Sequence, residues 1–454
     1  MIIVIMHCCN GKMGQVISGL VAEDAALTMV AGIDPRDDGH NPYPVFADIN
    51  DCDVEADVLI DFSTASVIDK LLDYCVAKKV PCVLCTTGLS EEQLKKVEEA
   101  VKEIASYTTG KDGLFFVGLP LVVRNKLYNV AAVLQDGEIL GFVTKTFLPN
   151  YSEFYEMRQF QPGPKKAEWI WFGDTEVPFG PQILFACDEM PELVVSAEIC
   201  EDVWSPIPPS IEAALCGATL IVNCSASDET VGKDVYRQRL ISGQSARLIA
   251  GYAYANAGEG ESTTDVVFGG HNIIAENGTI LKEAKRFVNE TIYSEIDIQR
   301  IVSERRKNTT FQMSEKHEEL ITVPFSLKLE ETALTRTFAA MPFVPSNEVE
   351  RSLRCEEILT IQAMGLKKRL AHAHCKSVVV GISGGLDSTL ALLVVAKAFD
   401  MLGIDRKNIE CVTMPCFGTT DRTYQNACLM TQKLGATLRE VPIGEAVLQH
   451  FRDI

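Results

Sequence analysis

Basic residues are scarce in this chain relative to acidic ones. The 454 residues include 42 Lys and Arg against 62 Asp and Glu, which gives a formal net charge of −20 at pH 7. A nucleic-acid-binding protein needs a basic face that neutralises backbone phosphates. The charge balance therefore argues against nucleic acid as a partner, and any anionic ligand must be met by local donors such as glycine turns.

Long hydrophobic runs and a secretory leader are also missing. The longest apolar run, near residues 114–123, is too short to span a bilayer. The N-terminus MIIVIMHCC has neither the basic region nor the cleavage site of a signal peptide. The 15 cysteines are odd in number, and the single C-x-x-C pair, Cys82 and Cys85, has no second pair to complete a zinc site. We expect a cytoplasmic protein with free thiols and no membrane segment.

The composition, with 47% hydrophobic and 23% charged residues, is typical of a soluble globular protein. A chain of 454 residues is too long for one hydrophobic core, and its length indicates about three domains.

The stretch VVSAEICEDVW, at residues 194–204, is an apolar run that ends in polar residues. Such a run is typical of a buried strand whose last residues face a cleft, and Cys200 would lie at that mouth. A cysteine acts as a nucleophile where a neighbouring group favours its thiolate, and Lys145 is the nearest candidate cation. The alternative is that Cys200 is a small buried apolar side chain.

Four motifs around this cysteine occur in the order KTFLPNYSEFYE, AEICEDVWSP, NCSAS and NAGEGESTTD. Together they resemble the glutaminase domain of glutamine-dependent NAD synthetase, a member of the nitrilase-like carbon-nitrogen hydrolases. The resemblance covers residues 108–323 and implies an αββα sandwich, with Cys200 as nucleophile and Lys145 as the cation beside the developing oxyanion. It also implies that glutamine is held by Tyr151, Glu201, Ser227 and Lys233.

The triad glutamate of that family lies on a strand well before the lysine, and this chain departs from the pattern. Between residues 107 and 144 the one glutamate is Glu138, in a turn. Glu153 and Glu156 lie near Lys145 in the sequence, but a general base must also reach the thiol. Because a positioned base contributes about 100-fold to 10,000-fold in rate, we expect negligible glutamine hydrolysis by the chain.

The N-terminal segment begins with an apolar strand at residues 2–6, followed by HCCNGKMG and an apolar-periodic helix. This order places a pyrophosphate against free backbone N–H groups and the positive end of the helix. Asp34 ends a second strand, where an acid accepts a hydrogen bond from a ribose hydroxyl. Cys8 stands where the first glycine is expected, and a side chain there blocks close approach of the phosphate.

The motifs CNGKMGQVI, GIDP, NPYPVFADI, ADVLIDFS and CTTGLSEEQL resemble the nucleotide-binding half of dihydrodipicolinate reductase. In that family the glycine turn, the acid and a TTG turn surround NADH or NADPH. The matching positions are Gly11, Met13, Asp34, Thr86, Thr87 and Gly88. The resemblance ends near Ala105, before the catalytic histidine and lysine motif of the reductase. We therefore expect at most NAD(P)H binding here, without hydride transfer to dihydrodipicolinate.

The most specific short motif is VVVGISGGLDST. It predicts a buried strand, an apolar helix, and a turn between them made of Ser383, Gly384, Gly385, Leu386, Asp387 and Ser388. The glycines let the backbone wrap an anion, the hydroxyls add donors, and the start of the helix adds partial positive charge. Asp387 suits such a site when it binds Mg²⁺ beside the phosphate. The alternative is a plain glycine turn in a βαβ unit.

This turn lacks the Gly-Lys pair of the kinase-type loop and resembles the pyrophosphate loop of the ATP pyrophosphatases. The following VTMPCFGTTDRTYQNA, with the hydrolase-like segment before it, selects NAD synthetase within that group. The resemblance implies that the loop and Met414 hold ATP, with Thr419 and Arg422 in a mobile segment nearby. The chain ends at Ile454, before the segments that complete the ATP site in the family, so we expect a truncated domain.

The sequence thus predicts an α/β chain with a Rossmann-type segment, a carbon-nitrogen hydrolase sandwich and a Rossmann-like ATP-pyrophosphatase domain. The expected boundaries are 1–106, 107–325 without the N-terminal part of the domain, a linker at 326–349, and 350–454. The predicted function is glutamine-dependent NAD⁺ synthesis, catalytically incomplete, with ATP and Mg²⁺ as cofactors, small-molecule substrates and the homo-oligomer usual in the family. Two alternatives stay open, an NAD(P)H-binding reductase and a non-catalytic fusion chain.

Overall fold

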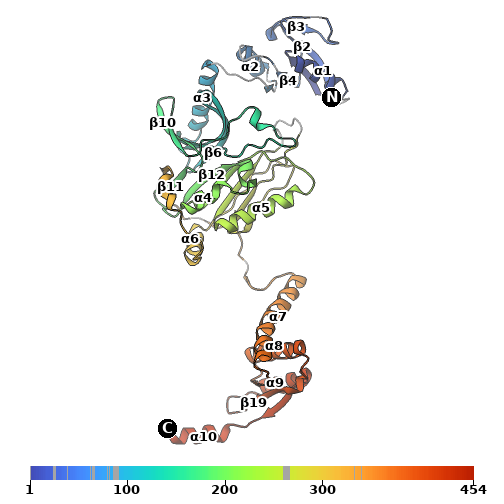
Figure 1. Cartoon of the computed structure of the whole chain (residues 1–454), viewed down its shortest axis with the longest axis vertical. Helices are drawn as coiled ribbons and strands as arrows, with labels where there is room; N and C mark the ends of the chain where they lie inside the picture. The colour runs from blue at the N-terminus through green and yellow to red at the C-terminus, as the bar shows by residue number, and fades with distance from the viewer. Residues whose placement is uncertain are drawn as a thin grey trace. The chain divides into compact units, whose positions relative to one another are not determined.

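The computed structural model describes most of the chain, in two compact units that divide after Arg336 (Figure 1). The described residues are 2–23, 27–37, 39–61, 63, 67–78, 80, 82–84, 91–258, 266–331, 333–338 and 340–454. Thr86, Thr87 and Gly88, which were expected at the cofactor site, lie outside the described residues, as does Cys85.

The N-terminal segment folds around a parallel sheet with the strand order β3-β2-β1-β4-β5. Its strands are β1 (Ile2–His7), β2 (Leu27–Ile33), β3 (Val45–Phe46), β4 (Val58–Asp61) and β5 (Cys82–Leu84). Its helices are α1 (Lys12–Glu23), η1 (Ile49–Asp51) and α2 (Ile68–Lys78). The strands carry apolar side chains on both faces, as parallel strands between helices require. The Rossmann-type expectation is confirmed.

The first sheet of the middle segment has the order β6-β7-β8-β10-β9. Its strands are β6 (Phe115–Val123), β7 (Lys126–Gln135), β8 (Glu138–Thr144), β9 (Glu168–Phe172) and β10 (Thr175–Gly180). Asp136 and Gly137 join β7 to β8 with φ angles of 46° and 87°. Two left-handed residues form the turn that suits a two-residue hairpin.

The second sheet has the order β16-β15-β14-β13-β12-β11-β17. Its strands are β11 (Leu184–Cys187), β12 (Val194–Ile199), β13 (Leu220–Ser225), β14 (Gly251–Asn256), β15 (Ile273–Glu276), β16 (Thr279–Glu283) and β17 (Thr322–Phe325). The helical elements of this segment are α3 (Glu91–Ser106), η3 (Glu156–Arg158), η4 (Cys200–Trp204), α4 (Pro209–Leu215), α5 (Lys233–Leu248), α6 (Ile298–Lys307) and η5 (Glu315–Glu319).

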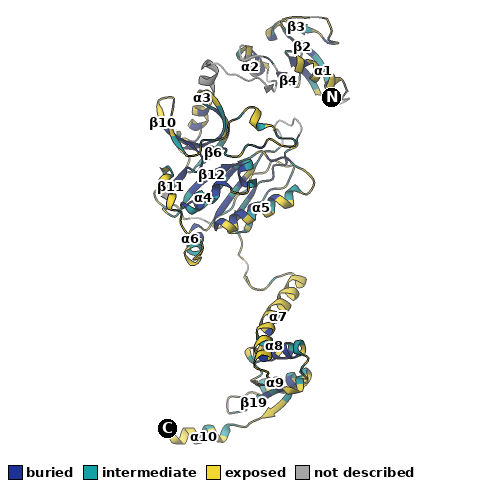
Figure 2. Cartoon of the chain, viewed as in Figure 1, coloured by how far each residue is buried: buried dark blue, intermediate teal, exposed yellow. Residues whose placement is uncertain are grey.

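These two sheets pack face to face through an apolar layer. Val133 of the first sheet and Phe185 and Val195 of the second belong to one buried cluster. Val101 of α3 packs on the outer face of the first sheet, and Ile241 of α5 on the outer face of the second. Figure 2 shows the strands of the second sheet largely in the colour of buried residues. The four layers form the αββα sandwich that the sequence predicts.

The C-terminal unit is built on a parallel sheet with the order β18-β19-β20. Its elements are α7 (Glu348–His372), β18 (Val378–Gly381), α8 (Leu386–Leu402), η6 (Arg406–Asn408), β19 (Ile409–Thr413), α9 (Asp421–Leu434), β20 (Thr437–Glu440) and α10 (Gly444–Asp453). Ala363 and Leu370 of α7 pack against Phe399 of α8. Among the described residues, no helix is both long and apolar enough to cross a membrane.

Candidate active site

Cys200 directly follows β12 and begins η4 in a left-handed conformation, with φ of 47°. Its backbone N–H donates to Oδ1 of the buried Asn223 at 3.0 Å. The Asn223 amide in turn donates to the Tyr252 hydroxyl at 3.2 Å, which donates to Glu198 at 2.5 Å. Burial raises the pKa of Glu198, and the Tyr252 hydroxyl lowers it in part. This chain of bonds fixes the backbone of the half-buried cysteine.

Lys145 directly follows β8, and its side chain is 4% exposed. Its ammonium forms an ion pair with the carboxylate of Glu156, which also accepts a hydrogen bond from the Asn129 amide at 2.8 Å. Burial lowers the pKa of Lys145, but the charges of Cys200 and Glu156 outweigh burial and raise the pKa above its ordinary value. The lysine therefore stays charged at neutral pH.

Cys200 and Lys145 line one cavity of about 610 Å³, together with Glu153 and Glu156. The two predicted residues therefore line the same cavity, and Cys200 is half-buried and not sealed in an apolar interior. Glu138 lies at the far end of the seven-residue strand β8, roughly 20 Å along the chain from Lys145.

An adjoining cavity of about 410 Å³ contains the residues that the resemblance assigns to glutamine. Its lining includes Cys200 and the four predicted residues Tyr151, Glu201, Ser227 and Lys233. The Tyr151 hydroxyl donates to the Glu201 carboxylate at 2.6 Å. The Lys233 ammonium lies 5.5 Å from the centre of the Trp204 ring and is paired with Asp228. The cavity thus contains a carboxylate and an ammonium group as well as the cysteine.

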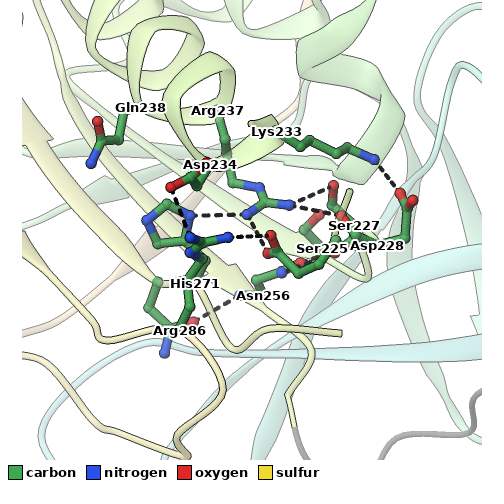
Figure 3. Close-up of polar contacts among 12 residues, drawn as sticks. Ser225, Ser227, Asp228, Lys233, Asp234, Arg237, Gln238, Asn256, His271 and Arg286 are labelled. Carbon is green, nitrogen blue, oxygen red and sulfur yellow. Dashed lines mark hydrogen bonds and ion pairs between the residues drawn. The ribbon is translucent and has the colours of Figure 1, made fainter. Parts of the chain in front are cut away.

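A buried arginine supports the loop that carries Ser227 and Asp228. Arg237, unexposed, donates to the Ser227 hydroxyl at 3.2 Å and to the Asp228 carbonyl at 3.0 Å (Figure 3). It also donates to the Glu229 carboxylate at 2.6 Å and lies 2.9 Å from Nδ1 of His271. Sequence reasoning missed this residue, because nothing in the motif marks an arginine on α5 as buried.

The loop after β18 is a tight glycine turn that leads into α8. Gly384 has φ of 75°, and a Cβ there would lie 2.0 Å from the Thr423 carbonyl oxygen, so the position requires glycine. The Gly385 N–H donates to the Ser383 hydroxyl at 3.3 Å, and the Ser383 and Ser388 hydroxyls lie 3.1 Å apart.

Asp387 is exposed at the start of α8. Met414, which is 51% exposed, follows β19, the parallel neighbour of β18. The carboxyl ends of parallel strands share one edge of a sheet, so the loop and Met414 lie at the same edge. Among the described residues no group of three or more His, Cys, Asp or Glu is arranged to hold a metal ion.

The N-terminal turn forms although Cys8 replaces a glycine. Cys8 adopts the left-handed region with φ of 65°, and its N–H donates to the Ile33 carbonyl at 2.7 Å. A Cβ at Gly14 would lie 2.2 Å from the Cys8 carbonyl oxygen, so Gly14 allows α1 to approach the turn closely. We did not single out Gly14 from the sequence, although the spacing Gly11 to Gly14 marks it.

The other expected cofactor residues surround this turn. Gly11 donates its N–H to the Cys8 carbonyl at 3.1 Å, and Met13 in α1 is 47% exposed. The Asp34 carboxylate, after β2, accepts from the Asn10 N–H at 3.2 Å. A small cavity of about 220 Å³ beside the turn is lined by His7 and Cys8, among others.

Three family models match successive parts of the chain. Residues 2–109 match the N-terminus of dihydrodipicolinate reductase, residues 86–306 match carbon-nitrogen hydrolase, and residues 358–453 match NAD synthase. The sandwich with its cysteine and lysine is thus a carbon-nitrogen hydrolase domain.

Known proteins are similar to different parts of the chain. The chain is 39% identical over 375 residues to the glutamine-dependent NAD(+) synthetase of Mycobacterium leprae, which covers 81% of this chain and 55% of that protein. It is 39% identical over 142 residues to the 4-hydroxy-tetrahydrodipicolinate reductase of Clostridium novyi, covering 31% of this chain and 55% of that one. A solved glutamine-dependent NAD(+) synthetase from Cytophaga hutchinsonii is 21% identical, with a TM-score of 0.40 and coverage of 85% of this chain and 63% of that chain.

The hydrolase and NAD synthase segments belong to the family of the glutamine-dependent NAD(+) synthetases, and they follow an N-terminal dihydrodipicolinate reductase segment. The chain spans about half the length of the synthetases and reductases cited above. The reductase match is confined to the N-terminal part.

Proposed function

We propose that the hydrolase segment releases ammonia from glutamine at Cys200, and that the NAD synthase segment uses ATP and ammonia to convert deamido-NAD to NAD⁺. One observation carries this proposal: Cys200, Lys145 and Glu156 line one cavity, and the four residues predicted to bind the substrate glutamine line the adjoining one. We place the reaction in the cytoplasm, which suits the free cysteines of the described residues.

In the proposed reaction the Cys200 sulfur attacks the side-chain amide carbon of glutamine. The Lys145 ammonium, which is buried and held in place by Glu156, stabilises the oxyanion that forms. Ammonia leaves with the thiol proton, and the γ-glutamyl thioester is then hydrolysed by water to glutamate and free thiol. Glu201 and Lys233 are suited by charge to the α-ammonium and α-carboxylate of the substrate.

Proton transfer is the weak step of this site. Three acids line the two cavities, namely Glu153, Glu156 and Glu201. Glu156 is paired with Lys145 and Glu201 is bonded to Tyr151, and among the described residues no hydrogen bond joins any of the three to the Cys200 thiol. We therefore propose that Glu156 orients the lysine and that hydrolysis is slow for lack of a base.

At the C-terminal segment, ATP would supply the AMP group that activates deamido-NAD. The loop of Ser383 to Ser388 is suited to a pyrophosphate, because Gly384 allows the left-handed turn against the start of α9 and the Ser383 and Ser388 hydroxyls add donors. Asp387 and the phosphates would together hold Mg²⁺. The N-terminal turn, with its close-packed Gly14 and Asp34, is a second nucleotide site that we assign to NAD(P)H.

The substrate assignment is tested with a glutamine analogue that carries an electrophilic diazoketone in place of the amide. We expect it to label Cys200 in the full chain, and glutamine to protect that cysteine. Lys233→Ala should weaken protection about tenfold or more, since it removes a charged contact to the substrate. Lys282→Ala, on β16, is the matched control and should not weaken it. Labelling of Cys200 that glutamine does not slow would refute the assignment.

A further inference from the structure

Asp202 is a fully buried acid whose carboxylate accepts three backbone N–H groups. Its Oδ1 accepts from Thr146 at 3.0 Å and from Phe147 at 2.8 Å, and its Oδ2 accepts from Ile199 at 2.9 Å. Thr146 and Phe147 directly follow the candidate ammonium residue, and Ile199 directly precedes the candidate nucleophile. One carboxylate therefore joins the chain next to both reactive side chains.

The two joined segments extend from different sheets of the sandwich. The lysine segment continues β8 of the first sheet, and the cysteine turn continues β12 of the second. Between the sheets the described contacts are largely apolar packing, which is strong but carries little directional information. Gln135 and Ser326 exchange two hydrogen bonds at another place, where β7 and β17 end. Hydrogen bonds are directional and lose strength when bent or stretched. Asp202 thus fixes how the ends of two separately built strands face each other.

If Asp202 served only to cap η4, the hydrogen bond from the Ile199 N–H would be sufficient. The two bonds across to Thr146 and Phe147 contribute nothing to that short helix, and a buried acid raises the cost of folding unless its partners compensate. The cross-sheet bonds are therefore the feature that requires a function.

We propose that Asp202 is a positioning residue of the active site, which holds the Lys145 ammonium beside the Cys200 thiol by tying the ends of the two sheets together. This role deepens the proposed function and rests on it, but the test below needs no substrate. When the hydrogen bonds of Asp202 are removed, the Lys145 ammonium is no longer held near the Cys200 thiol, and the positive electrostatic potential at the thiol decreases.

The test compares alkylation of Cys200 by neutral iodoacetamide and by anionic iodoacetate in the full chain, resolved by peptide mass spectrometry. The exposed Cys355 and Cys375 provide reference rates within the same molecule. A nearby ammonium favours the anionic reagent, so the ratio of the two rates reports local charge. Loosening of the loop raises both rates together and leaves the ratio unchanged.

Asp202→Ala should lower the iodoacetate to iodoacetamide ratio at Cys200 roughly tenfold, because the displaced ammonium no longer attracts the anionic reagent. Lys145→Met should lower it to the same extent, and the double variant should show no further loss. Asp202→Asn keeps one acceptor oxygen and introduces no charge, so it should fold. Because it can hold only one of the two segments, its ratio should also fall.

Asp297→Asn is the matched control, since Asp297 accepts the Arg300 N–H at 2.9 Å as the cap of α6. It should leave the ratio unchanged. A ratio in folded Asp202→Asn equal to that of the unmodified chain would overturn the proposal, as would independent, additive losses in the double variant. If the alanine variant does not fold, the asparagine variant decides. If glutamine does not protect Cys200 from the diazoketone but the alkylation ratios change as predicted, the substrate assignment is wrong and the positioning role of Asp202 stands.

Discussion

Lys145 and Glu156 form a buried ion pair, with side chains 4% and 15% exposed. Removing one charge from a buried pair leaves the other without its partner and costs about 3–5 kcal/mol. Lys145→Met removes the ammonium but keeps much of the apolar stem. Because Glu156 retains its hydrogen bond from Asn129, we expect the lower end, a loss of about 3 kcal/mol in the free energy of unfolding.

The double variant Lys145→Met/Glu156→Gln leaves no unpaired charge. Its stability should return to within about 1 kcal/mol of the unmodified chain, a coupling of about 2 kcal/mol or more between the two sites. Urea unfolding followed by tryptophan fluorescence measures this directly. The three tryptophans, Trp169, Trp171 and Trp204, all lie in the hydrolase segment, so the signal reports that segment alone.

Lys166→Met is the matched control, because Lys166 pairs with Glu319 at side-chain exposures of 75% and 50%. An exposed pair contributes at most about 1 kcal/mol. A loss in Lys145→Met no larger than in Lys166→Met would refute the reasoning. So would additive losses in the double variant. Since the pKa of Lys145 is raised above 10.5, the coupling should persist from neutral pH up to that value and disappear only above it.

Four further outcomes are expected. The protein should release ammonia from glutamine about 100-fold to 10,000-fold more slowly than an enzyme with a positioned base, and Cys200→Ala should abolish the remainder. Cys8→Gly should remove the strain of a non-glycine residue in the left-handed backbone region. Hydrogen exchange should then show that the free energy of opening of the β1 amides is higher by about 1 kcal/mol. Gly384→Ala should weaken ATP binding and lower the melting temperature more than Gly403→Ala, where φ is also positive but the space is open. Burial raises the pKa of Asp202 from 3.8 to about 7, so its contribution to stability is full below 3.8 and is lost as the pH rises to about 7. Urea midpoints should lose this part of their pH dependence in Asp202→Asn.

Local features of the fold were predictable from the sequence. The strand that ends before Cys200 and the glycine turn at Gly384 each depend on residues within a few positions. Turn and strand periodicities carry such information directly. The placing of Cys200 and Lys145 in one site was implied by family motifs, because periodicity places each at a strand end but does not say which strand ends lie around the same cavity.

The supporting residues were not predictable. Glu156 received little weight because proximity in sequence does not show that a carboxylate reaches a buried ammonium. Asp202 and Arg237 act through contacts between sheets or between a helix and a loop, which have no signature in a single sequence. A buried acid or arginine looks in the sequence like any surface charge, and only its partners distinguish it.

The central claim, that Cys200 is the nucleophile of a glutamine-consuming site, is tested most directly by trapping its covalent intermediate. The full chain is mixed with glutamine, quenched in acid, and the cysteine peptides are analysed by mass spectrometry. We predict a γ-glutamyl thioester on the Cys200 peptide, strongly reduced in Lys145→Met. A γ-glutamyl group on another cysteine, or none on Cys200 while ammonia is released, would contradict the account.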